Sequence, residues 1–233
     1  MKRILVIIPA YNEAAAIENT VHAVREKAPG CDLMVINDGS TDETHHILQR
    51  GKIEHLNLRC NLGIGGCVQS GFLYACENGY DYAVQIDGDG QHDPAYILRI
   101  IEQMERDGVD LGIGSRYVTK EGFQSSAARR AGITFLSKLI YLTCRARVKD
   151  VTSGYRVSSK KLIAYFANHY SDDYPEPDAI VMAVSNGFKV GEYPVIMHER
   201  TTGVSSISAF KFIYYMIKVS LSIIMCKSVL KGK

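Results

Sequence analysis

The chain has 233 residues, of which 46% are hydrophobic and 22% charged, a composition typical of a globular protein with a sizeable core. This length fits one large domain, or one domain with an appendage. The six cysteines lie far apart, which excludes the paired spacing of a zinc site and speaks against a disulfide framework in so long a chain. The apolar run before Pro9 is too short for a signal peptide. We therefore expect reduced thiols and a cytoplasmic protein.

Charge is distributed unevenly along the chain, although the net charge is only +2. Residues 1–115 carry 9 basic and 17 acidic side chains, whereas residues 116–161 carry 11 basic and 2 acidic ones. The tail from Ile207 onward has five lysines and no acidic residue. The acidic part suits a bound cation, and the basic parts suit phosphate or an anionic membrane surface. Solvated helix faces are the alternative for the middle segment, and we expect no nucleic-acid partner.

Strands and helices alternate over the first half of the chain. Five apolar runs predict buried strands, at 3–8, 33–38, 53–58, 80–87 and 109–116. Helical spacing and capping residues predict four helices between them, at 13–27, 40–50, 64–77 and 93–108. This alternation indicates an α/β fold with a doubly wound, mostly parallel sheet flanked by helices.

The pattern changes after Ser115. Residues 117–130 are polar and irregular, and predict a loop. Apolar spacing predicts helices over 131–145 and near 176–187, and a strand at 188–197. No repeat or low-complexity linker divides the chain, so we expect one domain over residues 1–206 and a separate helix over 207–233.

The C-terminal run from Ala209 is apolar but interrupted by Lys211, Lys218 and Lys227. Its longest uncharged stretch is eight residues, too short to span a bilayer in the usual way. We expect an amphipathic helix that lies on a membrane surface or contacts a membrane-protein partner, because lysine and tyrosine side chains reach from apolar surface to water. A helix at a homo-oligomer interface, or one packed on the core, is the alternative.

Polar residues follow four of the predicted strands, at the sheet edge where ligands bind in open α/β folds. The four segments are 9–13, 37–42, 87–91 and 114–117. In the third, Asp87 and Asp89 stand two residues apart among glycines, so that both carboxylates can reach one point. Oxygen ligands with open positions suit Mg²⁺ or Mn²⁺. A lone Asp-x-Asp pair is usually a surface turn, but its place directly after an apolar strand favours the metal site.

The first two strand ends offer candidates for nucleoside binding. Asp38 can accept hydrogen bonds from a nucleobase or ribose, or it can cap the next helix. Pro9, Tyr11 and Glu13 are candidates for a wall beside the base and ribose. Residues 61–66 provide either backbone N–H groups for the ligand or a plain tight turn. Neither a dinucleotide-binding glycine fingerprint nor a Walker A loop is present.

Four arginines are candidates for phosphate recognition, because a guanidinium binds phosphate through two donors: Arg116, Arg129, Arg130 and Arg200. Taken alone, each is more commonly a surface cation. Arg200 is the strongest candidate, because its loop contains Gly203 and several hydroxyl side chains.

Taken together, these stretches resemble the inverting family 2 glycosyltransferases of the GT-A fold, most closely the polyprenyl-phosphate sugar synthases of the dolichyl-phosphate mannose synthase type. The resemblance runs in family order over about residues 4–208, and is carried by IIPAYNEAAAI, INDGSTDET, NLGIGG, QIDGDGQHDP, GSRY, DVTSGYRVSS and HERTTGVSSIS. The combination is highly specific, although no single stretch is.

The resemblance implies a nucleotide-sugar donor and a divalent ion. Its donor-binding positions are Pro9, Tyr11, Glu13, Asp38 and Asp87. Its ligands for Mg²⁺ or Mn²⁺ are Asp87, Asp89 and Gln91. It further implies acceptor-phosphate contacts by Arg116, Arg130 and Thr134, and catalytic positions at Asp89, Glu176, Asp178 and Arg200, the last on a mobile loop.

Two departures from the family pattern bear on the acceptor. Many relatives have a lysine where this chain has Ile64. Residues 174–180 lie where relatives that glycosylate a hydroxyl have a Glu-Asp base motif, but their sequence matches the pattern of neither subgroup cleanly. A phosphate acceptor is already ionised, whereas a sugar hydroxyl needs a general base. Glu176 and Asp178 therefore decide the acceptor class: a base aimed at the reacting carbon favours a hydroxyl, and two carboxyls aimed away favour polyprenyl phosphate.

We expect a lipid-linked acceptor, either polyprenyl phosphate or a lipid-linked saccharide, used at the inner face of the membrane in cell-surface glycan assembly. A soluble saccharide acceptor is the first alternative. A sugar-nucleotide pyrophosphorylase would need a Gly-rich basic loop after the first strand, which is absent here. A non-catalytic nucleotide-binding subunit is the remaining alternative from another class.

Overall fold

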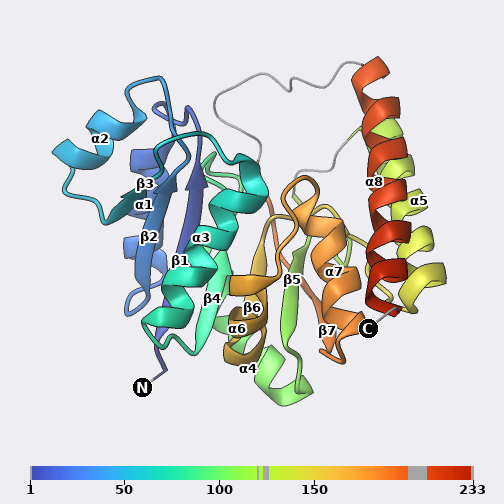
Figure 1. Cartoon of the computed structure of the whole chain (residues 1–233). Coiled ribbons are helices and arrows are strands. Elements are labelled where there is room, and N and C mark those ends of the chain that lie inside the picture. Colours follow the sequence, from blue (N-terminus) through green and yellow to red (C-terminus); the bar gives the residue numbers. More distant parts are fainter. Residues whose placement is uncertain (1, 120, 123–125, 199–208, 232–233) are drawn as a thin grey trace.

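The computed structural model describes residues 2–119, 121–122, 126–198 and 209–231 (Figure 1). The strands are β1 (Ile4–Ala10), β2 (Asp32–Asn37), β3 (His55–Asn57), β4 (Tyr82–Gln85), β5 (Leu111–Ser115), β6 (Arg156–Ser159) and β7 (Val190–Pro194). The helices are α1 (Ile17–Lys27), α2 (Thr44–Arg50), α3 (Gly63–Glu77), the short η1 (Pro94–Tyr96), α4 (Ile97–Asp107), α5 (Ala127–Cys144), α6 (Lys160–Asn168), α7 (Pro175–Ser185) and α8 (Ala209–Lys231).

The strands form one seven-stranded sheet in the order β3-β2-β1-β4-β6-β5-β7. All neighbours are parallel except β6, which runs antiparallel to both β4 and β5. The predicted mostly parallel α/β sheet is confirmed. Strand β6 and helix α6 were not predicted, because β6 is only four residues long and contains Arg156 and two serines in place of an apolar run. Its position between two other strands, rather than its own sequence, specifies it.

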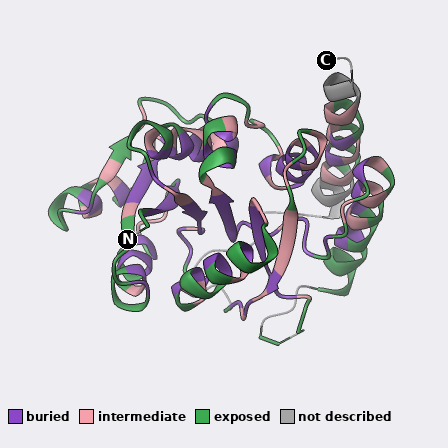
Figure 2. Cartoon of the chain, turned by 90° about the horizontal axis from the view of Figure 1, so that it is seen from below, coloured by how far each residue is buried: buried purple, intermediate pink, exposed green. Residues whose placement is uncertain are grey.

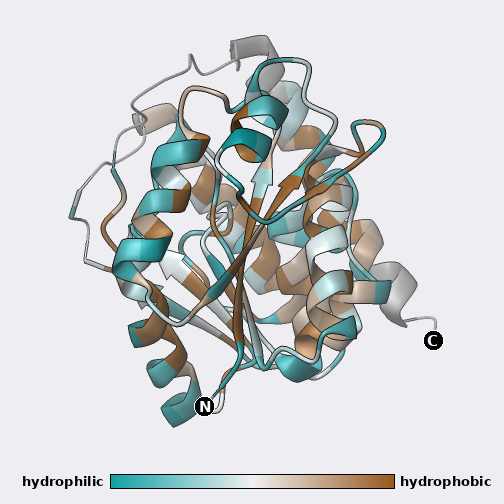
Figure 3. Ribbon diagram, turned by 90° about the vertical axis from the view of Figure 1, so that its left-hand side faces the viewer, coloured by the Kyte–Doolittle hydropathy of each residue, from teal (hydrophilic) through white to brown (hydrophobic). Residues whose placement is uncertain are grey.

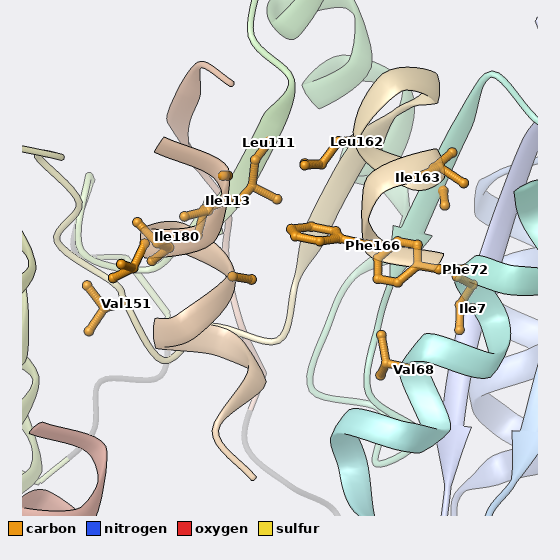
Figure 4. Close-up of a cluster of buried hydrophobic side chains, with 14 of the residues drawn as sticks. Ile7, Val68, Phe72, Leu111, Ile113, Val151, Leu162, Ile163, Phe166 and Ile180 are labelled. Carbon is orange, nitrogen blue, oxygen red and sulfur yellow. The ribbon is translucent and has the colours of Figure 1, made fainter. Parts of the chain in front are cut away.

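Side chains alternate between two cores on the two faces of the sheet. From β1, Leu5 and Ile7 join one cluster, while Ile4, Val6 and Ile8 join the other. Figure 4 shows part of the first cluster, formed by side chains of β1, α3, β5, α6 and α7. Hydrophobic residues lie along the central strands (Figure 3), and buried residues line the strands and the inward sides of the helices (Figure 2). Each fully buried Leu, Ile or Phe side chain contributes about 1.5–3 kcal/mol.

Helices α5 and α8 lie side by side at one side of the molecule and pack against α7 (Figures 1 and 2). Val219 and Ile223 of α8 are buried in the first core cluster. The opposite side of α8 is also apolar, with five largely exposed side chains: Tyr214, Ile217, Leu221, Ile224 and Met225. The expected separation into one polar and one apolar face is therefore not seen in the described part of the helix. Among the residues described, no helix is long and apolar enough to cross a membrane.

Candidate active site

A cavity of about 480 Å³ opens at the carboxyl ends of β1, β2 and β4. Its lining brings together residues from five separate stretches of the chain: Pro9, Ala10, Tyr11, Glu13, Asp38, Asn61, Gly63, Ile64, Cys67, Asp87, Gly88, Asp89 and Glu176. Every residue that the sequence predicts for donor binding lies in this lining. So do Asp89 and Glu176, from the predicted metal and catalytic positions.

The loop after β1 is fixed by hydrogen bonds to the loop after β2. The side-chain oxygen of Asn12 accepts from the backbone N–H of Thr41 at 2.8 Å, and Ser40 Oγ accepts from the N–H of Asn12 at 3.0 Å. Thr44 Oγ1 accepts from the N–H of Glu13 at 2.9 Å. These bonds hold the exposed ring of Tyr11 and the half-buried Glu13 at the rim of the cavity.

Asp38 connects the second strand end to the loop before α3. Its side chain is buried, and Oδ1 accepts a hydrogen bond from the N–H of Leu62 at 2.7 Å. This bond positions Asn61, Gly63 and Ile64 against the cavity. Asp38 therefore fixes the loop before α3 beside the cavity, and does not cap the helix that follows β2.

The acidic turn after β4 carries Asp87 and Asp89. The N–H of Asp87 donates to His92 Nδ1 at 3.0 Å, and Oδ1 of Asp89 accepts from the N–H of Gln91 at 3.0 Å. The Asp87 carboxylate also lies directly against Gly154, where an added Cβ would stand only 2.6 Å from Oδ1. Glycine at position 154 is thus required by the close approach of this carboxylate.

The carboxylates of the acidic turn fit a divalent ion that takes its remaining ligands from a substrate and from water. Mg²⁺ is commonly bound through one or two carboxylates, with phosphate oxygens and water completing the shell, and the acidic turn contributes two carboxylates, Asp87 and Asp89, to the lining of this cavity. The described part of the chain has no group of three or more His, Cys, Asp or Glu side chains that could hold an ion by themselves. The third predicted ligand, Gln91, directs its Nε2 to the carbonyl of His198 at 3.3 Å and is not part of the cavity lining.

Two buried arginines stand near the acidic turn. The Nε of Arg116 is 2.8 Å from Asp150, in a buried ion pair. Arg156, on β6, donates to the carbonyls of Ser153 at 2.8 Å and Val151 at 3.2 Å. Burial lowers the pKa of Arg156, against the opposing effect of Tyr170, Glu176, Asp150 and Asp87. No role is predicted from the sequence for Arg156, although it lies in DVTSGYRVSS. The signal that could have found it is its place in one of the stretches that carry the family resemblance.

Glu176 and Asp178 separate at the start of α7. Glu176 lines the cavity, and burial raises the pKa of its carboxyl, with Arg156 acting in the opposite direction. Asp178 is buried elsewhere, where Oδ2 accepts hydrogen bonds from Ser171 Oγ at 2.7 Å and from Ser222 Oγ of α8 at 2.6 Å. Only Glu176 of the two predicted base candidates is brought to the cavity.

The predicted acceptor-phosphate residues are not gathered there. Arg116 is engaged with Asp150, and neither Arg130 nor Thr134 lines the cavity. Arg130 and Thr134 are exposed one turn apart near the start of α5, where Thr134 Oγ1 donates to the Arg130 carbonyl at 2.8 Å. Arg200 lies outside the described residues.

The seven-stranded sheet, with polar segments after β1 and β2 and an acidic turn after β4, has the GT-A fold of glycosyltransferases. The same fold is found in glucosyl-3-phosphoglycerate synthase from Mycobacterium tuberculosis, solved with Mn²⁺, uridine diphosphate and phosphoglyceric acid. That structure matches with a TM-score of 0.73 at 16% identity, covering 97% of this chain and 78% of that chain. The chain belongs to glycosyl transferase family 2, whose family model matches residues 5–170.

Two relatives match along nearly the whole chain. Polyprenol monophosphomannose synthase of Mycolicibacterium smegmatis is 30% identical, over 94% of this chain and 86% of the relative. UDP-N-acetylglucosamine–dolichyl-phosphate N-acetylglucosaminyltransferase of Methanococcus voltae is 27% identical, over 94% of this chain and 97% of the relative. The family resemblance predicted from the sequence is confirmed, and the protein is a glycosyltransferase.

Proposed function

We propose that the protein is an inverting, metal-dependent glycosyltransferase that moves a sugar from a nucleotide-sugar donor to a lipid-linked acceptor, with polyprenyl phosphate as the preferred class. The observation that carries the proposal is the cavity whose lining brings the donor-binding candidates together with Asp89 and Glu176. The names of the two relatives above support the acceptor class, since one is named as a synthase of polyprenol monophosphomannose and the other as a transferase to dolichyl phosphate.

In this proposal Asp87 and Asp89 hold Mg²⁺ or Mn²⁺, with Gln91 as a further candidate ligand. The ion would neutralise charge on the departing nucleoside diphosphate. Asp38, Tyr11 and their neighbours at the rim bind and orient the nucleoside. Arg200 keeps its proposed catalytic role, and Arg116, Arg130 and Thr134 keep theirs toward the acceptor phosphate.

Glu176 distinguishes the two acceptor chemistries. A carboxyl with a raised pKa is protonated over a wider pH range, which reduces its repulsion toward a phosphate acceptor entering the cavity. A raised pKa equally suits a general base that activates a saccharide hydroxyl, which is the alternative function. The relatives' names favour the first, and substitution of Glu176 separates the two.

The experiment compares wild type and Glu176→Gln for nucleoside diphosphate release, with a donor panel, Mn²⁺, and either polyprenyl phosphate or a saccharide as acceptor. We expect turnover on polyprenyl phosphate, largely retained in the variant. A loss of about 10²–10⁴-fold, the usual contribution of a general base, would instead assign a hydroxyl acceptor and Glu176 as base. Absence of release with every donor would overturn the enzymatic proposal and favour a non-catalytic nucleotide-binding subunit.

We further propose that α5 and α8 face the membrane at its inner surface, where lipid-linked acceptors for cell-surface glycans are assembled. The exposed apolar side chains of α8 support this, together with Phe135 and Leu142 of α5, which are 53% and 68% exposed. A peripheral contact with a membrane protein is compatible with the same surface. A homo-oligomer built on α8 is the alternative, and dimerisation in the absence of lipid would favour it.

A further inference from the structure

A second cavity, of about 320 Å³, lies at the carboxyl-terminal end of α5. It is lined by Ser137, Lys138, Tyr141, Ala146, Arg147, Val148, Lys149 and Glu192. It shares no lining residue with the cavity at the strand ends. Neither the proposed donor nor the proposed metal accounts for it.

The cavity concentrates positive charge without carboxylate partners. Lys138, Arg147 and Lys149 line it, yet no carboxylate of the described residues forms an ion pair with any of them. The acidic residue in the lining, Glu192, accepts hydrogen bonds from the backbone N–H groups of Lys149 at 3.0 Å and Asp150 at 2.7 Å. Its carboxylate is therefore directed to backbone donors, and the cationic side chains keep an excess of positive charge.

Tyr141 holds two guanidinium groups close together. The Cζ atoms of Arg145 and Arg147 lie 5.5 and 5.6 Å from the centre of its ring. Hydrogen bonds from Arg147 and Arg145 lower the pKa of the Tyr141 hydroxyl. Arg145 also ends α5 in the left-handed conformation with φ of 64°, which residues with side chains rarely adopt. Like charges gathered in this way repel one another, and a bound anion would relieve the repulsion.

The cavity adjoins exposed apolar surface. Lys138 is three residues from Phe135 and four from Leu142, so the three side chains share one face of α5. Alongside, α8 presents its own exposed apolar side chains. The segment 127–149 contains six basic residues and no acidic residue: Arg129, Arg130, Lys138, Arg145, Arg147 and Lys149. An anion attached to a hydrocarbon chain would bind the basic side chains of the cavity and also cover the exposed apolar side chains. Free phosphate would bind only the basic side chains.

We propose that this cavity binds the phosphate of an anionic phospholipid, with Arg147, Lys149 and Lys138 as donors and Tyr141 as the residue that positions the guanidinium groups. The lipid chains lie along Phe135 and Leu142. The inference rests on the membrane contact proposed above, and specifies which lipid chemistry that contact recognises.

The experiment is flotation of the full chain with phosphatidylcholine vesicles, with and without phosphatidylglycerol. We expect binding only with phosphatidylglycerol. Arg147→Gln combined with Lys149→Gln should weaken it by about fivefold for each charge removed. The charge-matched control, Lys160→Gln with Lys161→Gln, removes two exposed cations on α6 and should leave binding nearly unchanged, because distant charges are screened. If the two double variants lost vesicle binding equally, the specific site would be refuted, and general attraction between the basic protein surface and anionic vesicles would explain the binding.

Tyr141→Phe sharpens the test, because it preserves the net charge and the ring. We expect it to weaken vesicle binding several-fold, and an unchanged affinity would overturn the built pocket. Displacement from the vesicles by millimolar inorganic phosphate would reassign the cavity to free phosphate. Nucleoside diphosphate release is measured on the same samples. A protein that keeps this release but never floats refutes the lipid site and leaves the proposed glycosyl transfer standing.

Discussion

Ser222→Ala tests whether a buried carboxylate attaches α8 to the rest of the protein. Oδ2 of Asp178 accepts hydrogen bonds from Ser171 Oγ at 2.7 Å and from Ser222 Oγ at 2.6 Å, and Asp178 is only 3% exposed. These two hydroxyl bonds lower the pKa of Asp178, against the larger effect of burial, which raises it. A hydrogen bond to a charged group contributes about 1.5–3 kcal/mol, so loss of the Ser222 hydroxyl should reduce the free energy of unfolding by that amount.

Ser220→Ala is the matched control, two residues away on the same helix. Ser220 Oγ donates to the Met216 carbonyl within α8 at 2.7 Å, and alanine favours helix, so this change should cost less than about 0.5 kcal/mol. Urea unfolding measures both, and in a chain of this size Ser222→Ala should lower Tm by roughly 3–12 °C. Equal stability of the two variants would refute the attachment through Asp178. The catalytic role of Asp178 stays a prediction, which Asp178→Asn tests by turnover.

Three further predictions concern the site at the strand ends. Gly154→Ala should weaken Mn²⁺ binding, measured by titration followed by electron paramagnetic resonance, because the new Cβ would lie 2.6 Å from Asp87 Oδ1; unchanged affinity would remove Asp87 from the ligand set. Because the pKa of Glu176 is raised in the folded protein, wild type is most stable below the pKa that this carboxyl has in the unfolded chain. Its stability falls as the pH rises through the pKa of the folded protein. The Tm of Glu176→Gln, measured in EDTA, should therefore rise relative to that of wild type as the pH increases across this range. A difference in Tm that does not change with pH would contradict the raised pKa. Mn²⁺ should bind weakly alone and more tightly when nucleoside diphosphate is bound. Nucleoside diphosphate affinity should rise by the same factor when Mn²⁺ is bound, because the coupling is reciprocal; affinities that do not depend on each other would refute an ion shared between protein and diphosphate.

The parallel part of the sheet and its ligand edge are predictable from the sequence. Strands β1, β2 and β4 are apolar runs that end in polar segments, and parallel strands bring those ends to one edge. Pro9, Asp38 and Asp87 therefore meet in one cavity, as predicted. The local pattern and the tertiary arrangement agree there, because each strand is buried on both faces and cannot shift without exposing apolar side chains.

The second half of the chain is less predictable, because its elements are specified by neighbours distant in sequence. Strand β6 pairs with β4 and β5, and its Arg156 is tolerated only because backbone carbonyls and acidic residues surround it. Asp178 carries the same lesson. The sequence predicts catalytic positions at both Glu176 and Asp178, but residues two apart in a helix point about 200° apart around its axis. Asp178 therefore bonds to α8, while Glu176 lines the cavity.

The buried arginines change the electrostatic argument for a bound ion. Taken from the sequence alone, Asp87 and Asp89 repel each other and require a cation between them. In the folded protein burial lowers the pKa of Arg156, and Asp87 is the smallest of the charges that oppose this effect. Asp87 also adds slightly to the effect of Asp150, which against burial raises the pKa of Arg116. The two buried cations therefore compensate a small part of the negative charge of Asp87. The need for an ion then arises less from repulsion within the acidic turn than from the diphosphate of a donor. A diphosphate would bring additional negative charge against Asp89 and Glu176, in a cavity whose described lining contains no arginine.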